Sequence, residues 1–244
     1  MSSSVFSAIF FSFVGGLIPS LLWGMVVLTQ DQHSEKKRNL VWVFGIGAAV
    51  AVPVILAVRS LDWGIDTLGV ALSEQWYLFI TGALIEEVLK GGALYLFVFR
   101  RDYFDEPIDT FIYGAAIALG FAAVENIIFV GGEFILSTPT IQVIGLLMFR
   151  TVTAVIVHLV STAFIAYGLY IGVYARSWLP GVLSVILGIG VHGAYNLLLS
   201  ATHEASLFIN TYTIIMLGAG VLMYRRVSYL QHHSHHKTHL DETD

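Results

Sequence analysis

Long apolar runs separated by short polar segments dominate the pattern of this chain. Runs of about 20 apolar residues, the length that crosses a bilayer as a helix, lie at 5–29, 40–58, 76–99, 110–130, 141–172, 179–201 and 206–224. Runs of this length indicate membrane helices rather than strands. We therefore expect an all-α, polytopic membrane helix bundle with about seven transmembrane helices, forming a single transmembrane domain over residues 1–244.

Three segments depart from the regular pattern. The run at 141–172 is too long for one upright helix, so it would be tilted, broken near Arg150 or extended beyond the membrane. Segment 59–75 is too polar to span and is expected to form a short interfacial helix. The histidine-rich segment 227–244 is expected to be a disordered cytoplasmic tail, although its histidines would also suit metal binding.

Basic residues concentrate in alternate connections. They follow the first, third, fifth and seventh apolar runs, whereas the opposite connections contain only Arg59. The positive-inside rule places such basic connections in the cytoplasm, so we expect the N-terminus outside and the C-terminus in the cytoplasm of a multi-pass protein of the cell (plasma or inner) membrane. The basic residues concerned are Lys36, Lys37, Arg38, Arg100, Arg101, Arg176, Arg225, Arg226 and Lys237.

The composition agrees with a membrane protein. Hydrophobic residues make up 57% of the chain and charged residues 12%, whereas soluble domains carry about 25% charged residues. The expected partners are the lipid bilayer and a membrane-anchored protein, not nucleic acid, and the oligomeric state stays open. The chain has no cysteine, which excludes disulfides, thiolate metal sites and a cysteine nucleophile.

Charged residues inside the third apolar run point to chemistry. Glu86, Glu87 and Lys90 lie in the segment TGALIEEVLKGGALYLFVF, residues 81–99. Each charge at the bilayer centre costs about 2.5–3.5 kcal/mol on insertion scales. Glu86 and Lys90 share a helix face because they are four residues apart. Two close carboxylates beside an amine suit a general acid or base, and the alternative is a buried ion pair that joins helices.

Three further runs carry polar residues at a similar depth. They contain Glu125 with Asn126, then Arg150, His158 and Thr162, and finally His192 with Asn196. Any one of these could simply bond a neighbouring helix. Their presence on successive spans at a shared depth favours one polar, water-admitting site, and the small residues from Gly114 to Ala123 would let the fourth span approach its neighbours closely.

Hydrolysis of a peptide bond fits these groups. The sequence has no Gly-Xaa-Ser-Xaa-Gly or His-Glu-Xaa-Xaa-His motif. A divalent metal such as zinc would be held by Glu86, Glu125, His158 and His192. In a metal-free scheme Glu86 and Glu125 would hold and deprotonate a water. His192 and Asn196 would then donate hydrogen bonds to the oxyanion.

Two other functions are compatible with the same residues. Chains of Glu, His and Lys within a membrane also build proton- or cation-coupled transporters. A non-catalytic membrane scaffold that keeps the fold of an enzyme is the second alternative. The complete set of polar residues favours an enzyme over such a scaffold.

Four motifs, in order on separate spans, carry a family resemblance. EEVLK (86–90), FAAVEN (121–126), the series Arg150, His158, Thr162, and HGAYN (192–196) together resemble the PrsW family of intramembrane proteases. That family is related to the superfamily of CAAX-prenyl and bacteriocin-processing proteases. The resemblance covers a core of about residues 76–201 and implies a helical membrane fold with its active site among the helices.

The resemblance also implies roles for individual residues. Glu86 would activate a water and Glu87 would complete an essential glutamate pair, while His158 and His192 would be catalytic and Asn196 would bind the oxyanion. Glu125 stands where many relatives in the superfamily have histidine, so the water-binding details differ in this chain. Lys90, Asn126, Arg150 and Thr162 would support these groups. The implied activity is glutamic-type intramembrane endopeptidase cleavage of a membrane-anchored substrate such as an anti-sigma factor.

Overall fold

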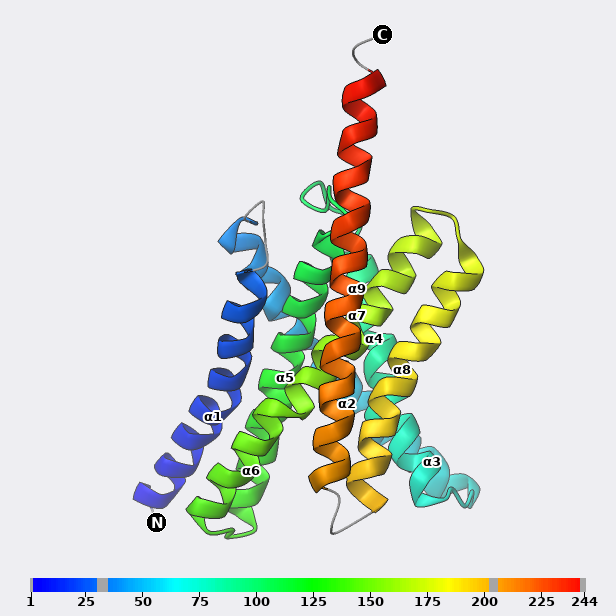
Figure 1. Ribbon diagram of the computed structural model, residues 1–244. Helices are drawn as coiled ribbons and strands as arrows, with labels where there is room; N and C mark the ends of the chain where they lie inside the picture. The colour runs from blue at the N-terminus through cyan, green and yellow to red at the C-terminus, as the bar shows by residue number, and fades with distance from the viewer. Residues whose placement is uncertain (1, 30–34, 202–205, 242–244) are drawn as a thin grey trace.

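The computed structural model describes residues 2–29, 35–201 and 206–241, and over these residues it contains helices and no strands. The helices are α1 (Ser2–Leu28), α2 (Lys37–Leu68), α3 (Glu74–Phe79), the π-helical segment η1 (Ile80–Leu84), α4 (Ile85–Phe97), α5 (Asp109–Ile135), α6 (Thr140–Val152), α7 (Ala154–Val173), α8 (Trp178–Ala201) and α9 (Ser206–Asp241). They form one elongated bundle (Figure 1). The expectation of an all-α helix bundle is confirmed.

Six helical stretches among the described residues are long and apolar enough to cross a membrane. One of these stretches, Thr140–Val173, joins α6 and α7. The remaining predicted span, at 76–99, corresponds to the helical run α3–η1–α4, which is interrupted by the π-turn and carries Glu86, Glu87 and Lys90. Large apolar side chains such as Val41 and Leu56 are exposed on the outside of the bundle, as expected of a surface that faces lipid.

Two of the irregular segments can now be described. The run at 141–172 is broken at Thr153, between α6 and α7, which is one of the three alternatives expected. The prediction of a separate interfacial helix at 59–75 was wrong. Residues 59–68 continue α2, which ends at Gly69 with a positive φ of 61°. Gly64 stays within the helix, and the left-handed conformation that ends it occurs at Gly69.

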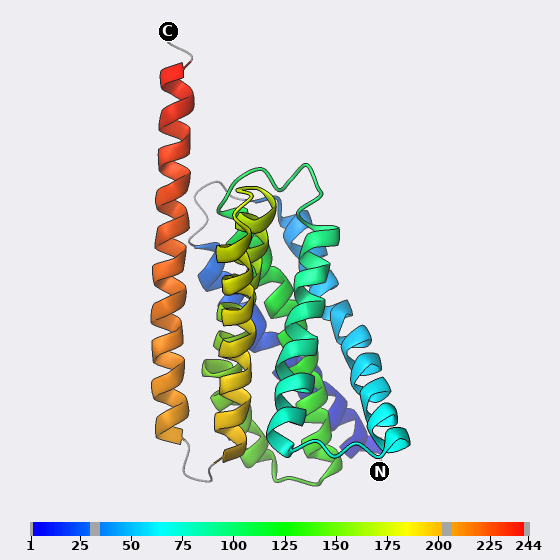
Figure 2. The ribbon, with the colours of Figure 1, turned by 90° about the vertical axis from the view of Figure 1, so that its right-hand side faces the viewer.

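The disorder and the cytoplasmic location of the C-terminal segment 227–244 stay predictions. The described part of 227–244 is helical as far as Asp241, and residues 242–244 lie outside the described residues. A helix satisfies its own backbone hydrogen bonds, and α9 extends past the ends of the other helices (Figure 2).

The basic connections share one end of the bundle. α1 ends there, α2 begins there, and the α4–α5 and α7–α8 connections lie at the same end, from which α9 projects (Figure 1). This is the arrangement that the charge pattern requires. The side of the membrane on which this end lies stays a prediction.

The helix α5 forms the centre of the packing. Every residue from Asp109 to Ala123 is buried, because small residues allow the neighbouring backbones to approach. A Cβ atom added at Gly120 would lie 2.0 Å from the carbonyl oxygen of Phe44 on α2. A Cβ atom added at Gly47 would lie 2.2 Å from the carbonyl oxygen of Ile117 on α5. Glycine at both positions therefore fixes the crossing of α2 and α5.

We predict that Gly120→Ala destabilises the protein by about 1–3 kcal/mol, since two backbones must separate to admit the methyl group. Reversible unfolding in detergent micelles measures the change. Gly45→Ala on α2 is the control, because nothing lies within 4 Å of a Cβ atom there. Equal effects of the two substitutions would contradict the close approach of α2 and α5 as the reason for glycine at position 120.

Candidate active site

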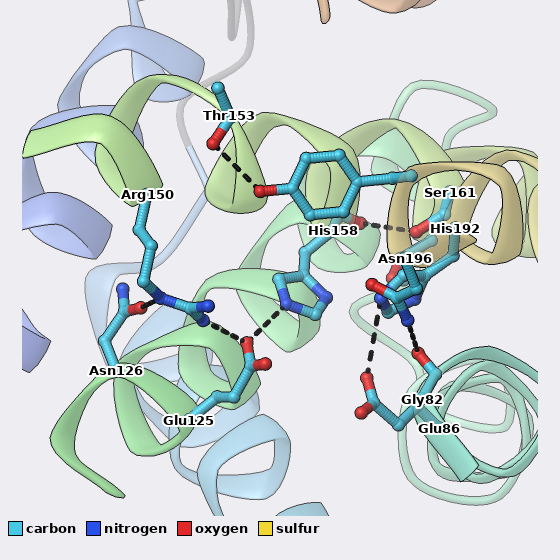
Figure 3. A network of polar contacts seen from close by, with 12 residues as sticks. Gly82, Glu86, Glu125, Asn126, Arg150, Thr153, His158, Ser161, His192 and Asn196 are labelled. Carbon is cyan, nitrogen blue, oxygen red and sulfur yellow. Dashed lines mark hydrogen bonds and ion pairs between the residues drawn. The ribbon is translucent and has the colours of Figure 1, made fainter. Parts of the chain in front are cut away.

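The polar residues expected to meet do meet, inside the bundle. They come from α4, α5, α6, α7 and α8, and Figure 3 shows most of them turned toward one another. Glu87 and Lys90 are 0% exposed, and His158 and His192 are 2% and 4% exposed. The site is therefore enclosed by protein, which is how a membrane bundle accommodates ionisable side chains.

A π-turn precedes the glutamate pair. The segment η1 ends at Leu84, so α4 starts directly before Glu86 and Glu87. Asn196 on α8 donates from Nδ2 to the carbonyl oxygen of Gly82 within this turn, at 2.6 Å (Figure 3). A Cβ atom at Gly82 would lie 2.6 Å from that nitrogen. The π-turn is a common device at functional sites, and the sequence pattern did not predict it.

Glu87 accepts hydrogen bonds from four side chains. Its Oε1 receives Lys90 Nζ at 2.6 Å, His192 Nδ1 at 2.8 Å and Ser161 Oγ at 2.9 Å. Its Oε2 receives Thr162 Oγ1 at 3.2 Å. A fully buried carboxylate requires this number of donors. Glu87 therefore ties α4 to α7 and α8, and Ser161 is a participant that the motifs did not indicate.

The two histidines face their carboxylate partners with different ring nitrogens. His192 Nδ1 faces the Glu87 carboxylate and therefore donates at 2.8 Å, and its Nε2 lies 3.8 Å from Glu86 Oε2. His158 Nδ1 lies 3.1 Å from Lys90 Nζ, which can only donate. The proton of His158 is therefore on Nε2, which donates to Glu125 Oε2 at 2.7 Å.

Glu125 and Arg150 close one side of the site. Arg150 Nη2 lies 2.9 Å from Glu125 Oε2, and Arg150 Nε donates to Asn126 Oδ1 at 2.7 Å (Figure 3). The Glu125 side chain is 35% exposed, against 11% for that of Glu86. The Arg150 guanidinium therefore balances the charge of the Glu125 carboxylate.

Glu86 differs from Glu87 in its hydrogen bonds. The side chain is buried, yet Oε2 has no hydrogen-bond partner among the described residues. The basic side-chain atoms nearest to it are Lys90 Nζ at 3.9 Å and His192 Nε2 at 3.8 Å. A buried carboxylate oxygen without a donor leaves a polar position for a further ligand, such as a water or a cation.

Three of the four predicted metal ligands form a group. One ligand atom each from Glu86, His158 and His192 lies within 4.8 Å of the others. Two histidines and a carboxylate form a ligand set of catalytic zinc, and the unpartnered oxygen of Glu86 fits it. Among the described residues Glu125 is not in this group, in contrast to the prediction. It holds the opposite nitrogen of His158, as a carboxylate behind a metal-binding histidine does.

The comparison with known proteins identifies a family for the chain. A family model described as PrsW family intramembrane metalloprotease matches residues 35–223. Protease PrsW of Geobacillus kaustophilus (strain HTA426) is 30% identical over 115 residues, 47% of this chain and 49% of that protein, so this match spans about half of that relative. No solved structure matches the chain.

Two other relatives align over more of their length. Protease PrsW of Shouchella clausii (strain KSM-K16) is 25% identical over 77% of this chain and 83% of that protein. Protease PrsW of Clostridioides difficile (strain 630) is 27% identical over 84% of this chain and 86% of that protein. Because the family model covers most of the sequence and all the motifs around the buried carboxylates, the chain belongs to the PrsW family of intramembrane metalloproteases.

Proposed function

We propose that this chain is an intramembrane endopeptidase that hydrolyses a peptide bond of a membrane-anchored protein, with a water activated by Glu86. The observation that supports it best is the unpartnered oxygen of Glu86, which faces His192 Nε2 inside a buried polar site. A base that must hold a water needs a free acceptor of this kind.

The reaction would use Glu86 twice. Glu86 takes a proton from the water while the water oxygen attacks the carbonyl carbon of the scissile bond. It then gives this proton to the amide nitrogen as the C–N bond breaks, which releases an amine and a carboxylic acid. Asn196 would bind the oxyanion, since its amide has two N–H donors and the contact with Gly82 uses one of them.

The histidines would be held in position by the other carboxylates. Glu87 fixes the ring of His192, and Glu125 fixes that of His158. Glu87 is thus better suited to a positioning role than to contact with substrate, because both of its oxygens already accept hydrogen bonds. If a divalent ion binds, Glu86, His158 and His192 would hold it, and it would supply Lewis-acid polarisation of the carbonyl and a more acidic water.

The substrate class follows from the family and from the location of the site. A peptide bond must reach a buried site among apolar helices, which favours a transmembrane or membrane-anchored protein. An anti-sigma factor is the specific candidate implied by the family resemblance.

We predict that Glu86→Gln lowers the rate of cleavage by about 10²–10⁴-fold, the usual contribution of a general acid or base. The rate is measured with purified protein in proteoliposomes and a fluorogenic peptide or a membrane-anchored anti-sigma factor. Glu74→Gln is the matched control, because Glu74 is an exposed carboxylate on the same helical run. Cleavage by Glu86→Gln at the rate of the unsubstituted protein would refute the assignment.

We also predict opposite effects of the two adjacent glutamates on stability. Glu87→Gln leaves the buried Lys90 ammonium without its closest counter-charge and should destabilise the fold by about 3–5 kcal/mol. Glu86→Gln removes a carboxylate oxygen that has no hydrogen-bond partner among the described residues and should be neutral or stabilising. Unfolding in detergent micelles compares the two variants. A larger loss for Glu86→Gln would be inconsistent with Glu87 as the positioning carboxylate and Glu86 as the base.

A further inference from the structure

The Lys90 ammonium lies among the candidate metal ligands. It is fully buried, at 2.6 Å from Glu87 Oε1, 3.1 Å from His158 Nδ1 and 3.9 Å from Glu86 Oε2. It also lies 4.6 Å from the centre of the Phe121 ring, in cation–π geometry. The cluster therefore already contains a cation, and that cation is supplied by the chain itself.

Lys90 donates a hydrogen bond to His158 Nδ1, the ring nitrogen that a metal ion would need. His158 Nε2 donates its proton to Glu125 at 2.7 Å, so only Nδ1 has a lone pair to offer without breaking that pair. An imidazole nitrogen has a single lone pair, and the lone pair of Nδ1 accepts a hydrogen bond from Lys90. The hydrogen bond and a metal–nitrogen bond at this atom are mutually exclusive.

The positive charge of Lys90 also disfavours metal binding at this site. An ammonium at 3.9 Å from Glu86 partly neutralises the one carboxylate of the ligand group. A divalent ion bound to Glu86 would also be repelled by the ammonium, and repulsion between close charges is strong in a buried site. His192 Nε2 presents a different environment, since its neighbour is the Glu86 carboxylate.

We propose that Lys90 is the resident cation of this cluster, and that a divalent metal ion binds to Glu86, His158 and His192 only when the Lys90 ammonium leaves His158 Nδ1. Lys90 keeps a second anchor for that movement, because Glu87 Oε1 is its shortest contact. Lys90 thereby sets the affinity of the site for metal. The inference concerns the site of the proposed protease, but it makes a statement about metal affinity that is independent of peptide cleavage.

The test compares Co²⁺ binding to the full-length protein and to Lys90→Met in detergent micelles. Methionine has a similar length and no charge, so His158 Nδ1 gains a free lone pair. We expect Lys90→Met to bind Co²⁺ about 10- to 100-fold more tightly, the range over which neighbours of metal ligands change affinity. The visible absorption of tetrahedral Co²⁺ and calorimetric titration with Zn²⁺ are the readouts.

Glu86→Gln in each background separates this site from the histidine-rich C-terminal segment. That substitution removes a ligand of the buried group, whereas the histidines of 227–244 remain. Only binding that is lost with Glu86→Gln is assigned to the buried group. Lys90→Arg is a further control, because it keeps the positive charge and should not raise the affinity.

Lys90→Met removes the counter-charge of Glu87, so the double variant Lys90→Met/Glu87→Gln is measured beside it. Glutamine retains an oxygen that can accept the proton of His192 Nδ1. Tighter Glu86-dependent binding in either variant supports the proposal. Unchanged or weaker binding in both variants overturns it, as does the absence of Glu86-dependent binding in every variant. Neither outcome changes the test of cleavage by Glu86→Gln.

Discussion

The burial of the Glu87 carboxylate is the constraint around which the site is built. The residue is 0% exposed, so its charge has to be balanced by side chains, and Lys90, His192, Ser161 and Thr162 together provide the hydrogen bonds. These donors come from α4, α7 and α8. Since an unpaired buried charge is strongly destabilising, satisfying this carboxylate fixes the mutual positions of three helices. The orientation of His192 then follows from the same requirement.

Regular helix is interrupted at two places near the buried Glu87. The π-turn of η1 lies directly before the glutamates, and the break at Thr153 separates Arg150 from His158. Backbone groups released by such interruptions need partners within a membrane. Asn196 bonds the carbonyl of Gly82, and Trp23 Nε1 donates to the carbonyl oxygen of Thr151 at 2.8 Å. The irregular backbone is thus held by side chains of other helices.

The sequence predicted what depends on residue type and spacing. Long apolar runs give the helices, and charges at a shared depth indicated that Glu86, Glu125, His158 and His192 would face one region. The contacts within that region depend on rotation of the helices, which spacing does not specify. Hence the π-turn, the role of Ser161 and the position of Glu125 behind His158 were not predicted. The polar stretch at 59–68 was misinterpreted because hydropathy measures membrane burial and not helix continuity.

The two helices that carry the Glu125–Arg150 pair are held very differently. Every residue in the first half of α5 is buried, whereas in α6, all of which lies within the described residues, Val143 alone is buried. The ion pair therefore links a firmly packed wall to a weakly anchored one. Removal of either charge would therefore loosen α6 more than α5.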